Sequence, residues 1–170
     1  MPEKKKSLFE RIFGKADGVE GEQLGSPMSG ELIPLDQVAD PVFSGKVLGD
    51  GVAIRPAEGK VLSPVDGQVV NLPDTGHAVC VSSAGGADIL IHVGRDTVEL
   101  KGEHFSPQVK EGDTVKRGQL LLEFDREALL AAGYDLDTPV VVSNADDYEL
   151  VSAAPGPVQG GQTVLTLKKK

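Results

Sequence analysis

The chain has 170 residues, enough for one domain that buries an apolar core of its own. Its 26 acidic and 17 basic side chains leave a formal charge of -9, which argues against a nucleic-acid partner because phosphate backbones select basic surfaces. No apolar run approaches the ~20 residues needed to cross a bilayer, and the single cysteine, Cys80, excludes an intramolecular disulfide and indicates a reducing compartment, the cytoplasm.

Residues 1–25 form an N-terminal tail that differs in composition from the rest. Lysines at positions 4–6 precede residues 8–13, where a helix would carry one apolar stripe flanked by cations. Such a helix would make weak contact with an anionic surface at the inner face of the plasma membrane. A frayed tail is an equal interpretation, because so short a helix is marginal in water. Residues 14–25 are acidic and glycine-rich, which predicts a flexible linker.

Residues 26–170 show short apolar alternations separated by glycine turns such as Asp66-Gly67. One segment reads as a helix: Asp125 is a favourable N-cap, a run rich in alanine and leucine follows, and Gly133 ends it. The pattern predicts an all-β domain, an antiparallel β-sandwich or barrel of short strands with one or two short helices.

Two internal echoes indicate pseudo-symmetry within this domain. Residues 26–35 match residues 63–72: both begin Ser-Pro, continue with an aliphatic residue and a glycine, and end on leucine. Residues 109–115 match residues 158–164 in the pattern Val-x-x-Gly-x-Thr-Val. Two such echoes favour a fold with related halves.

Two of the three histidines lie where strands are expected. His92 closes the apolar alternation over residues 89–93, on the face opposite Ile91. His77 follows a turn-like Asp74-Thr75-Gly76 segment and opens another apolar strand. Opposed side chains on paired strands lie within ~5.5 Å, so the two imidazoles can meet. From spacing alone, ordinary structural histidines are the commoner interpretation, and His104 receives no role.

Facing imidazoles suit phosphoryl transfer. A neutral imidazole nitrogen is a competent nucleophile near pH 7, because its ordinary pKa is ~6.5. Phosphoryl transfer needs mostly in-line positioning and charge stabilisation. One histidine can carry the group while the other donates hydrogen bonds to its oxygens, if an acceptor fixes the second ring nitrogen of the carrier.

Residues 90–102, Leu-Ile-His-Val-Gly-Arg-Asp-Thr-Val-Glu-Leu-Lys-Gly, closely resemble the active-site signature of glucose-class enzyme IIA of the bacterial phosphoenolpyruvate-dependent sugar phosphotransferase system. Further matching blocks occur in the expected order, at residues 42–54, 64–67, 75–78 and 138–144. The resemblance covers residues 26–170 and outweighs the structural interpretation of the two histidines. It implies a β fold of the duplicated hybrid motif type and a phosphocarrier function.

The resemblance also implies a role for each site residue. His92 would accept a phosphoryl group from the phosphocarrier protein HPr and donate it to a cysteine on the IIB domain of a sugar permease of the glucose or N-acetylglucosamine class. His77 would stabilise the group, Thr75 would hydrogen-bond the His77 ring, and the Gly94 carbonyl would orient His92. A phosphohistidine intermediate would form and no cofactor would be required. Regulatory target proteins are a further class of partner.

Members of that family dock their partners on a shallow apolar ring bordered by acids, and some bind zinc. In this chain Asp40 and Asp96 would face arginines of HPr, while Glu149 would join His77 and His92 as a zinc ligand in a partner complex. An apolar patch on an acidic protein also suits docking on physical grounds. The predicted ring consists of Val42, Phe43, Val47, Leu48, Leu90 and Val98.

Three other functions fit parts of the sequence. A zinc peptidase of related β architecture would use two histidines and an acid, but the chain has neither a His-x-His nor a His-Glu-x-x-His motif. Residues 109–119 read like a lipoyl or biotinyl carrier, but neither Lys60 nor Lys101 has the expected hairpin-tip setting. A non-catalytic interaction module stays open, and it would differ from a carrier in lacking a labile phosphohistidine.

Overall fold

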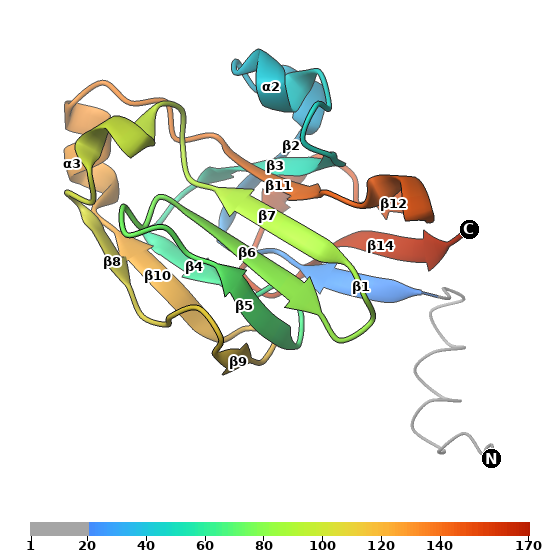
Figure 1. Cartoon of the computed structure of the whole chain (residues 1–170). Coiled ribbons are helices and arrows are strands. Elements are labelled where there is room, and N and C mark those ends of the chain that lie inside the picture. Colours follow the sequence, from blue (N-terminus) through green and yellow to red (C-terminus); the bar gives the residue numbers. More distant parts are fainter. Residues whose placement is uncertain (1–20) are drawn as a thin grey trace.

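The computed structural model describes residues 21–170, and the helix and membrane contact predicted for the start of the tail lie outside this part of the chain. The described residues form antiparallel sheets with two short α-helices, α2 (Pro41–Ser44) and α3 (Arg126–Ala131) (Figure 1). Short 3-10 helices cover Leu35–Gln37, Thr97–Leu100 and Ala145–Asp147. The predicted all-β class with short helices is confirmed. Among these residues no helix combines the length and apolar character that crossing a membrane requires.

One sheet of eight strands carries the fold, and two sheets of three strands pack against it. In spatial order the large sheet contains β13 (Gly156–Val158), β2 (Gly30–Pro34), β3 (Asp50–Pro56), β11 (Thr138–Val142), β7 (Asp88–His92), β6 (Ala78–Ser83), β5 (Gly67–Asn71) and β9 (Thr114–Val115). One small sheet contains, in spatial order, β1 (Glu22–Gly25), β14 (Thr163–Lys169) and β12 (Tyr148–Ser152). The other contains β4 (Lys60–Leu62), β10 (Leu120–Phe124) and β8 (Phe105–Pro107). Because β13 and β9 end the large sheet as separate edges, it is open and not a closed barrel.

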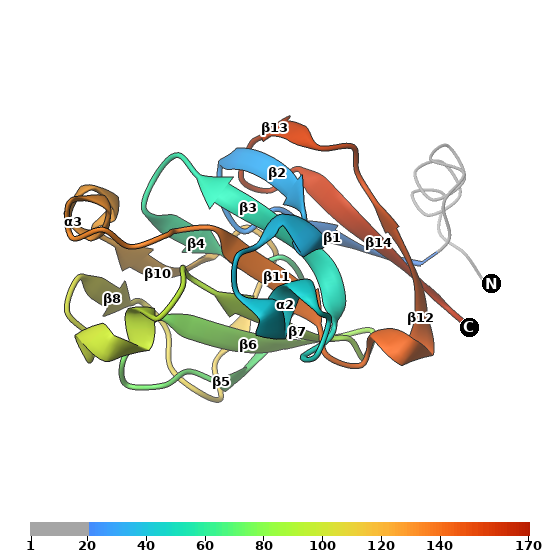
Figure 2. The same cartoon turned by 90° about the horizontal axis from the view of Figure 1, so that it is seen from above.

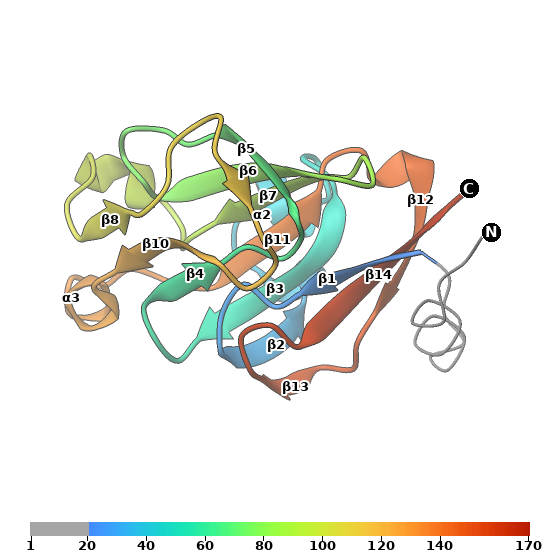
Figure 3. The same ribbon diagram turned by 90° about the horizontal axis from the view of Figure 1, so that it is seen from below.

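The strand order shows that the fold is duplicated. Outward from the central β11–β7 pair, β3, β2 and β13 follow on one side, and β6, β5 and β9 follow on the other. The small sheets repeat the same correspondence, since β1, β14 and β12 are arranged as β4, β10 and β8 are. Figure 3 shows β1 with β14 and β4 with β10 together on the underside of the molecule. The pseudo-symmetry predicted from the sequence echoes is therefore present in the architecture.

Ser26 and Ser63 are equivalent residues in the two halves. Each hydroxyl donates a hydrogen bond of 2.6 Å to the carbonyl two residues further along the chain. The two segments also cross: the amide before each serine donates to the proline carbonyl of the other segment, at 2.9 Å to Pro64 and 2.7 Å to Pro27. The first sequence echo thus marks a reciprocal contact between the halves.

The second echo has a different partner in space. Gly161 N donates to the Ser26 carbonyl at 2.9 Å, and Gly118 N donates to the Ser63 carbonyl at 2.8 Å. Gly161 therefore corresponds to Gly118. The sequence echo, which pairs Gly161 with Gly112, is wrong on this point. The three glycines have similar positive φ angles of 91°, 90° and 94°. The same tight turn therefore occurs at all three glycines, and a short glycine pattern does not show which of the two turns in one half is equivalent to the turn in the other half.

Apolar side chains alternate between the two faces of the large sheet, as half-buried strands require. Val52 and Ile54 of β3 and Val140 of β11 join the core that the two small sheets cover. The opposite face carries a smaller cluster to which Ala53 and Val141 belong. Helix α2 lies over this second face, as the view from above shows (Figure 2).

The domain begins earlier than the sequence indicated. The sequence predicts a flexible tail up to residue 25, but residues 22–25 form β1 and pair with β14. Leu24 is fully buried in the main core. The four residues Glu-Gln-Leu-Gly contain one large apolar side chain, which is too few to show an alternation, so the pattern does not distinguish a strand from a linker.

The two halves differ in one connection that matters for the functional site. Between β2 and β3 the chain makes a long excursion, residues 35–49, which includes α2. The equivalent connection between β5 and β6 is short and covers residues 72–77. The long connection brings Phe43 over the large sheet, and the short one brings Thr75 and His77 to the end of β7. The duplicated frame therefore supports an asymmetric site.

Candidate functional site

His77 and His92 meet because β6 and β7 are antiparallel neighbours. Ala78 is the register partner of His92, and Val93 N donates to the His77 carbonyl at 2.8 Å. The two imidazole rings lie with centroids 5.0 Å apart and an interplanar angle of 81°. The edge of one ring therefore faces the plane of the other. The juxtaposition expected from the two strand patterns is present.

The ring of His92 is held in one tautomer. Its Nδ1 lies 2.8 Å from the Gly94 carbonyl. A carbonyl oxygen only accepts hydrogen bonds, so Nδ1 is the protonated nitrogen of the neutral ring and Nε2 keeps its lone pair. Nε2 is thus the ring nitrogen of this histidine that can act as a nucleophile. His92 is partly exposed, whereas Ile91 and Val93 on either side of it are completely buried.

A glycine is required at position 94. Its φ of +74° lies in the left-handed region, where a side chain is strained. A Cβ atom there would also lie 2.8 Å from the Asp135 carbonyl and 2.9 Å from Cγ2 of Thr97. The reversal at Gly94 turns its own carbonyl back toward the ring of His92.

Hydrogen bonds on both sides fix the peptides around Gly94. Thr97, which is completely buried, donates from its hydroxyl to the Val93 carbonyl at 2.5 Å. Arg95 N donates to the Asp135 carbonyl at 2.9 Å. Thr97 lies within the signature at residues 90–102 but receives no role from the sequence, and Asp135 lies outside every matching block, because both act through the backbone of other residues.

Phe43 packs against the face of His92. The ring centroids lie 5.2 Å apart at 52°, and Phe43 is only 4% exposed. Helix α2 presents this ring, and Asp40 caps the helix by accepting a hydrogen bond of 3.0 Å from Val42 N. Phe43 was expected in the docking ring. The structure places it beneath that ring, as a support for the His92 imidazole.

His77 is also bound at one ring nitrogen. Its Nδ1 lies 2.6 Å from Oγ1 of Thr75, and the side chain is 8% exposed. When the threonine hydroxyl donates this bond, Nε2 of the neutral His77 ring carries the proton. That nitrogen is then a hydrogen-bond donor for an anion held on His92.

Both histidines stay neutral near pH 7. Burial, with a smaller effect of His92, lowers the pKa of His77 to about 4. Burial also lowers the pKa of His92, although the Gly94 carbonyl and the carboxylates of Asp40 and Asp96 oppose the shift. The site therefore combines a neutral nucleophile with a neutral donor, and no proton has to leave before either can act.

The other residues of the predicted docking ring lie around this pair. Val42 and Leu48 are each 41% exposed, Val98 is 50% exposed and Val47 is 72% exposed. Leu90 is partly buried on the same face of β7 as His92. These exposed aliphatic side chains lie on the β2–β3 connection and on the β7–β8 connection, and together they make a surface suited to a protein partner.

Glu149 is not brought to the histidines. It lies on β12 opposite Lys168 of β14, in a different sheet from His77 and His92. Within residues 21–170, no three histidine, cysteine, aspartate or glutamate side chains are grouped closely enough to hold a metal ion. In the described residues Glu149 therefore does not join the two histidines as a third ligand, and two imidazoles alone leave a zinc site incomplete.

Comparisons with known proteins match this geometry to one family. Residues 22–148 match the family model described as phosphoenolpyruvate-dependent sugar phosphotransferase system, EIIA 1. A beta-glucoside-specific EIIBCA component of Dickeya chrysanthemi is 51% identical over 92% of the chain, but the chain spans only 24% of that protein. A glucose-specific EIIA component of Bacillus cereus is 41% identical over 88% of the chain and 90% of its own length. The glucose permease IIA from Mycoplasma capricolum has a TM-score of 0.82 at 31% identity, over 87% of this chain and 96% of that one.

Proposed function

The chain belongs to the EIIA 1 family of the phosphoenolpyruvate-dependent sugar phosphotransferase system, and we propose that it carries the phosphoryl group of that system on Nε2 of His92. It accepts the group from the histidine of phosphorylated HPr and delivers it to a cysteine of a permease IIB domain. The observation that carries the assignment is the 2.8 Å bond from Nδ1 of His92 to the Gly94 carbonyl. That bond leaves Nε2 as the free nucleophile, with His77 beside it.

Phosphoryl acceptance needs no proton transfer at this site. The lone pair of Nε2 attacks the phosphorus atom held by HPr, and the phosphorus–nitrogen bond of HPr breaks. Its electron pair returns to the HPr imidazole. The ring of His92 becomes a phosphorylated imidazolium that keeps its proton on Nδ1, and this N–H still donates to the Gly94 carbonyl, so the positive ring remains hydrogen-bonded.

Donation runs by the same geometry in reverse. A thiolate of the IIB domain attacks phosphorus, the bond to Nε2 breaks, and the electron pair returns to the His92 ring. In this step His77 stabilises the charge on the phosphoryl oxygens through its Nε2 proton, supported by Thr75 at 2.6 Å. Phe43 and the buried side of the site exclude water from the carrier ring, which favours transfer to a protein over hydrolysis.

The relatives indicate the class of acceptor. The names of similar proteins specify glucose, N-acetylglucosamine and beta-glucosides, so we propose a IIB domain of a permease of the glucose or N-acetylglucosamine class as the acceptor. The reaction starts from phosphoenolpyruvate, and we place it in the cytoplasm. No metal takes part in any of these steps as we propose them.

Phosphotransfer in vitro tests the proposal. Labelled phosphoenolpyruvate, enzyme I and HPr are combined with the wild-type chain, with His92→Ala, and with His104→Asn as a matched histidine control. His104 has a φ of +76°, which asparagine tolerates. Acid-labile, base-stable label on the wild type and on His104→Asn alone supports the carrier. Label that persists on His92→Ala, or a folded wild type without label, overturns it.

A further inference from the structure

The turn at residues 135–137 lies directly behind the Gly94 peptide. Its carbonyl at Asp135 accepts from Arg95 N at 2.9 Å and would lie 2.8 Å from any Cβ at position 94. Leu136 is buried in the core next to the same glycine, with its Cδ2 atom 3.3 Å from that Cβ position. The place of this turn therefore decides where the Gly94 carbonyl points, and through it which nitrogen of His92 carries the proton.

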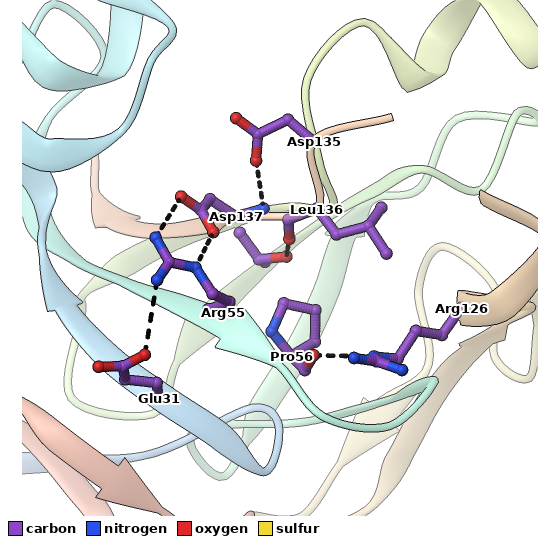
Figure 4. Close-up of polar contacts among 8 residues, drawn as sticks. Glu31, Arg55, Pro56, Arg126, Asp135, Leu136 and Asp137 are labelled. Carbon is purple, nitrogen blue, oxygen red and sulfur yellow. Dashed lines mark hydrogen bonds and ion pairs between the residues drawn. The ribbon is translucent and has the colours of Figure 1, made fainter. Parts of the chain in front are cut away.

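The turn is closed by a side chain of its own. The carboxylate of Asp135 accepts a hydrogen bond of 3.0 Å from Asp137 N (Figure 4). This contact is an Asx-type turn, in which a short acidic side chain holds the backbone two residues on. It keeps the Asp135 carbonyl aimed away from its own turn and toward Gly94 and Arg95.

An ion pair attaches the turn to the large sheet. Arg55 of β3 donates from Nε to Asp137 at 3.0 Å and from a terminal nitrogen to its other carboxylate oxygen at 3.3 Å. The Asp137 side chain is only 11% exposed. Glu31 of β2 lies 3.5 Å from the remaining terminal nitrogen of Arg55, so the three side chains form a row from β2 over β3 to the residue before β11 (Figure 4). A two-point arginine contact to a carboxylate with little exposure has a defined geometry, unlike an ordinary surface pair.

We propose that Asp135 is a positioning residue for His92, and that the Arg55–Asp137 ion pair holds the Asp135 turn against the Gly94 peptide. Nothing in this row touches the phosphoryl group. Arg55 holds the turn in place, the turn sets the direction of the Gly94 carbonyl, and that carbonyl sets which nitrogen of His92 is protonated. The loop between α3 and β11 thereby becomes part of the carrier site.

The proposal rests on the proposed function of His92 for its rate readout only. The tautomer of His92 is measured separately, on the full chain alone, from the nitrogen resonances of its ring at neutral pH. Arg55→Ala should increase the fraction protonated at Nε2, because the Gly94 carbonyl loses its fixed direction. Transfer from phosphorylated HPr should then fall about tenfold, the lower end of the cost of losing a partner that orients a histidine.

Arg126→Ala is the matched control. Arg126 also anchors to the end of β3, where its Nε donates to the Pro56 carbonyl at 2.9 Å, but among the described residues no hydrogen bond or ion pair joins it to the 135–137 turn (Figure 4). Both substitutions remove one arginine hydrogen-bonded at the same strand end. The proposal holds if Arg55→Ala changes the tautomer and the transfer rate while Arg126→Ala changes neither. Equal behaviour of the two variants in both measurements overturns it.

A second pair of variants tests the turn itself. Asp135→Asn keeps an oxygen acceptor for Asp137 N, and Asp135→Ala removes it. The alanine variant should show the altered His92 tautomer and the slower transfer, and the asparagine variant should restore both. A wild-type tautomer in a folded Asp135→Ala protein contradicts the positioning role. If the wild type takes no label at all, the carrier function fails, and the tautomer measurement still decides the role of Asp135.

Discussion

The rings of Phe43 and His92 pack against each other with their centroids 5.2 Å apart, although Phe43 belongs to α2 and His92 to the end of β7. The contact exists because the β2–β3 connection is long enough to cross the outer face of the large sheet. Its equivalent in the other half of the fold is short and carries His77. The His92 imidazole thus has a ring from each of the two equivalent connections beside it, which explains how a duplicated fold builds a single site.

Removing the Phe43 ring should raise the pKa of His92. Burial is the main reason why that pKa is low, and Phe43→Ala exposes the imidazole to water. Titration of His92 by NMR should move toward its ordinary value of ~6.5, with an intermediate position for Phe43→Leu. Phe43→Ala should also lower the free energy of unfolding by about 3 kcal/mol, as expected for a buried phenylalanine. An unchanged His92 titration in the alanine variant would show that other groups bury this ring.

Gly94→Ala should abolish phosphoryl acceptance while lowering the free energy of unfolding only moderately. The new methyl group meets the Asp135 carbonyl, so the peptide must turn and the bond to His92 is lost. Gly112→Ala is the control, because its φ of +94° is equally strained while no atom lies within 4 Å of the added Cβ. Each substitution should cost about 1–2 kcal/mol through backbone strain. Only Gly94→Ala should lose transfer from HPr; comparable rates for the two variants contradict the role of Gly94.

Acid should destabilise the protein through His77. The pKa of His77 is about 4 in the folded chain and near its ordinary value when unfolded. The unfolded state therefore binds more protons between these values, and stability falls as pH drops from about 6.5 toward 4. From pH 7 to pH 5 this loss amounts to about 2 kcal/mol. Urea unfolding of wild type and His77→Gln at both pH values isolates the contribution of His77. Between pH 7 and pH 5 the free energy of unfolding of the wild type should fall by about 2 kcal/mol more than that of the variant.

Thr75→Val should separate acceptance from donation. The substitution keeps the shape of the side chain and removes the hydroxyl that lies 2.6 Å from His77 Nδ1, so the neutral ring no longer has a preferred tautomer. The phosphorylated form should still be produced, but transfer to a IIB domain should slow, as it should in His77→Gln. Rapid-quench assays with purified IIB measure this step. Normal donation in both variants contradicts the stabilising role of His77.

The sequence determined the local features of this site. The alternation around His92 predicted which neighbours are buried, and Ile91 and Val93 are indeed inaccessible. The roles expected for Thr75 and Gly94 came from the resemblance to a known family, and both contacts are local because they reach only two positions along the chain. The all-β class and the internal echoes followed from periodicity and glycine spacing, which are properties of short segments.

Tertiary structure alone decided which distant segments enclose these residues. Phe43 became a support of His92, Asp135 came to lie behind Gly94, and Glu149 was placed in another sheet. The equivalence of Gly161 with Gly118 was likewise set by which serine each turn binds. These relations depend on connection lengths and on the order of strands across the sheets. A sequence pattern specifies which face of a strand is buried, whereas packing of the whole chain specifies what that face meets.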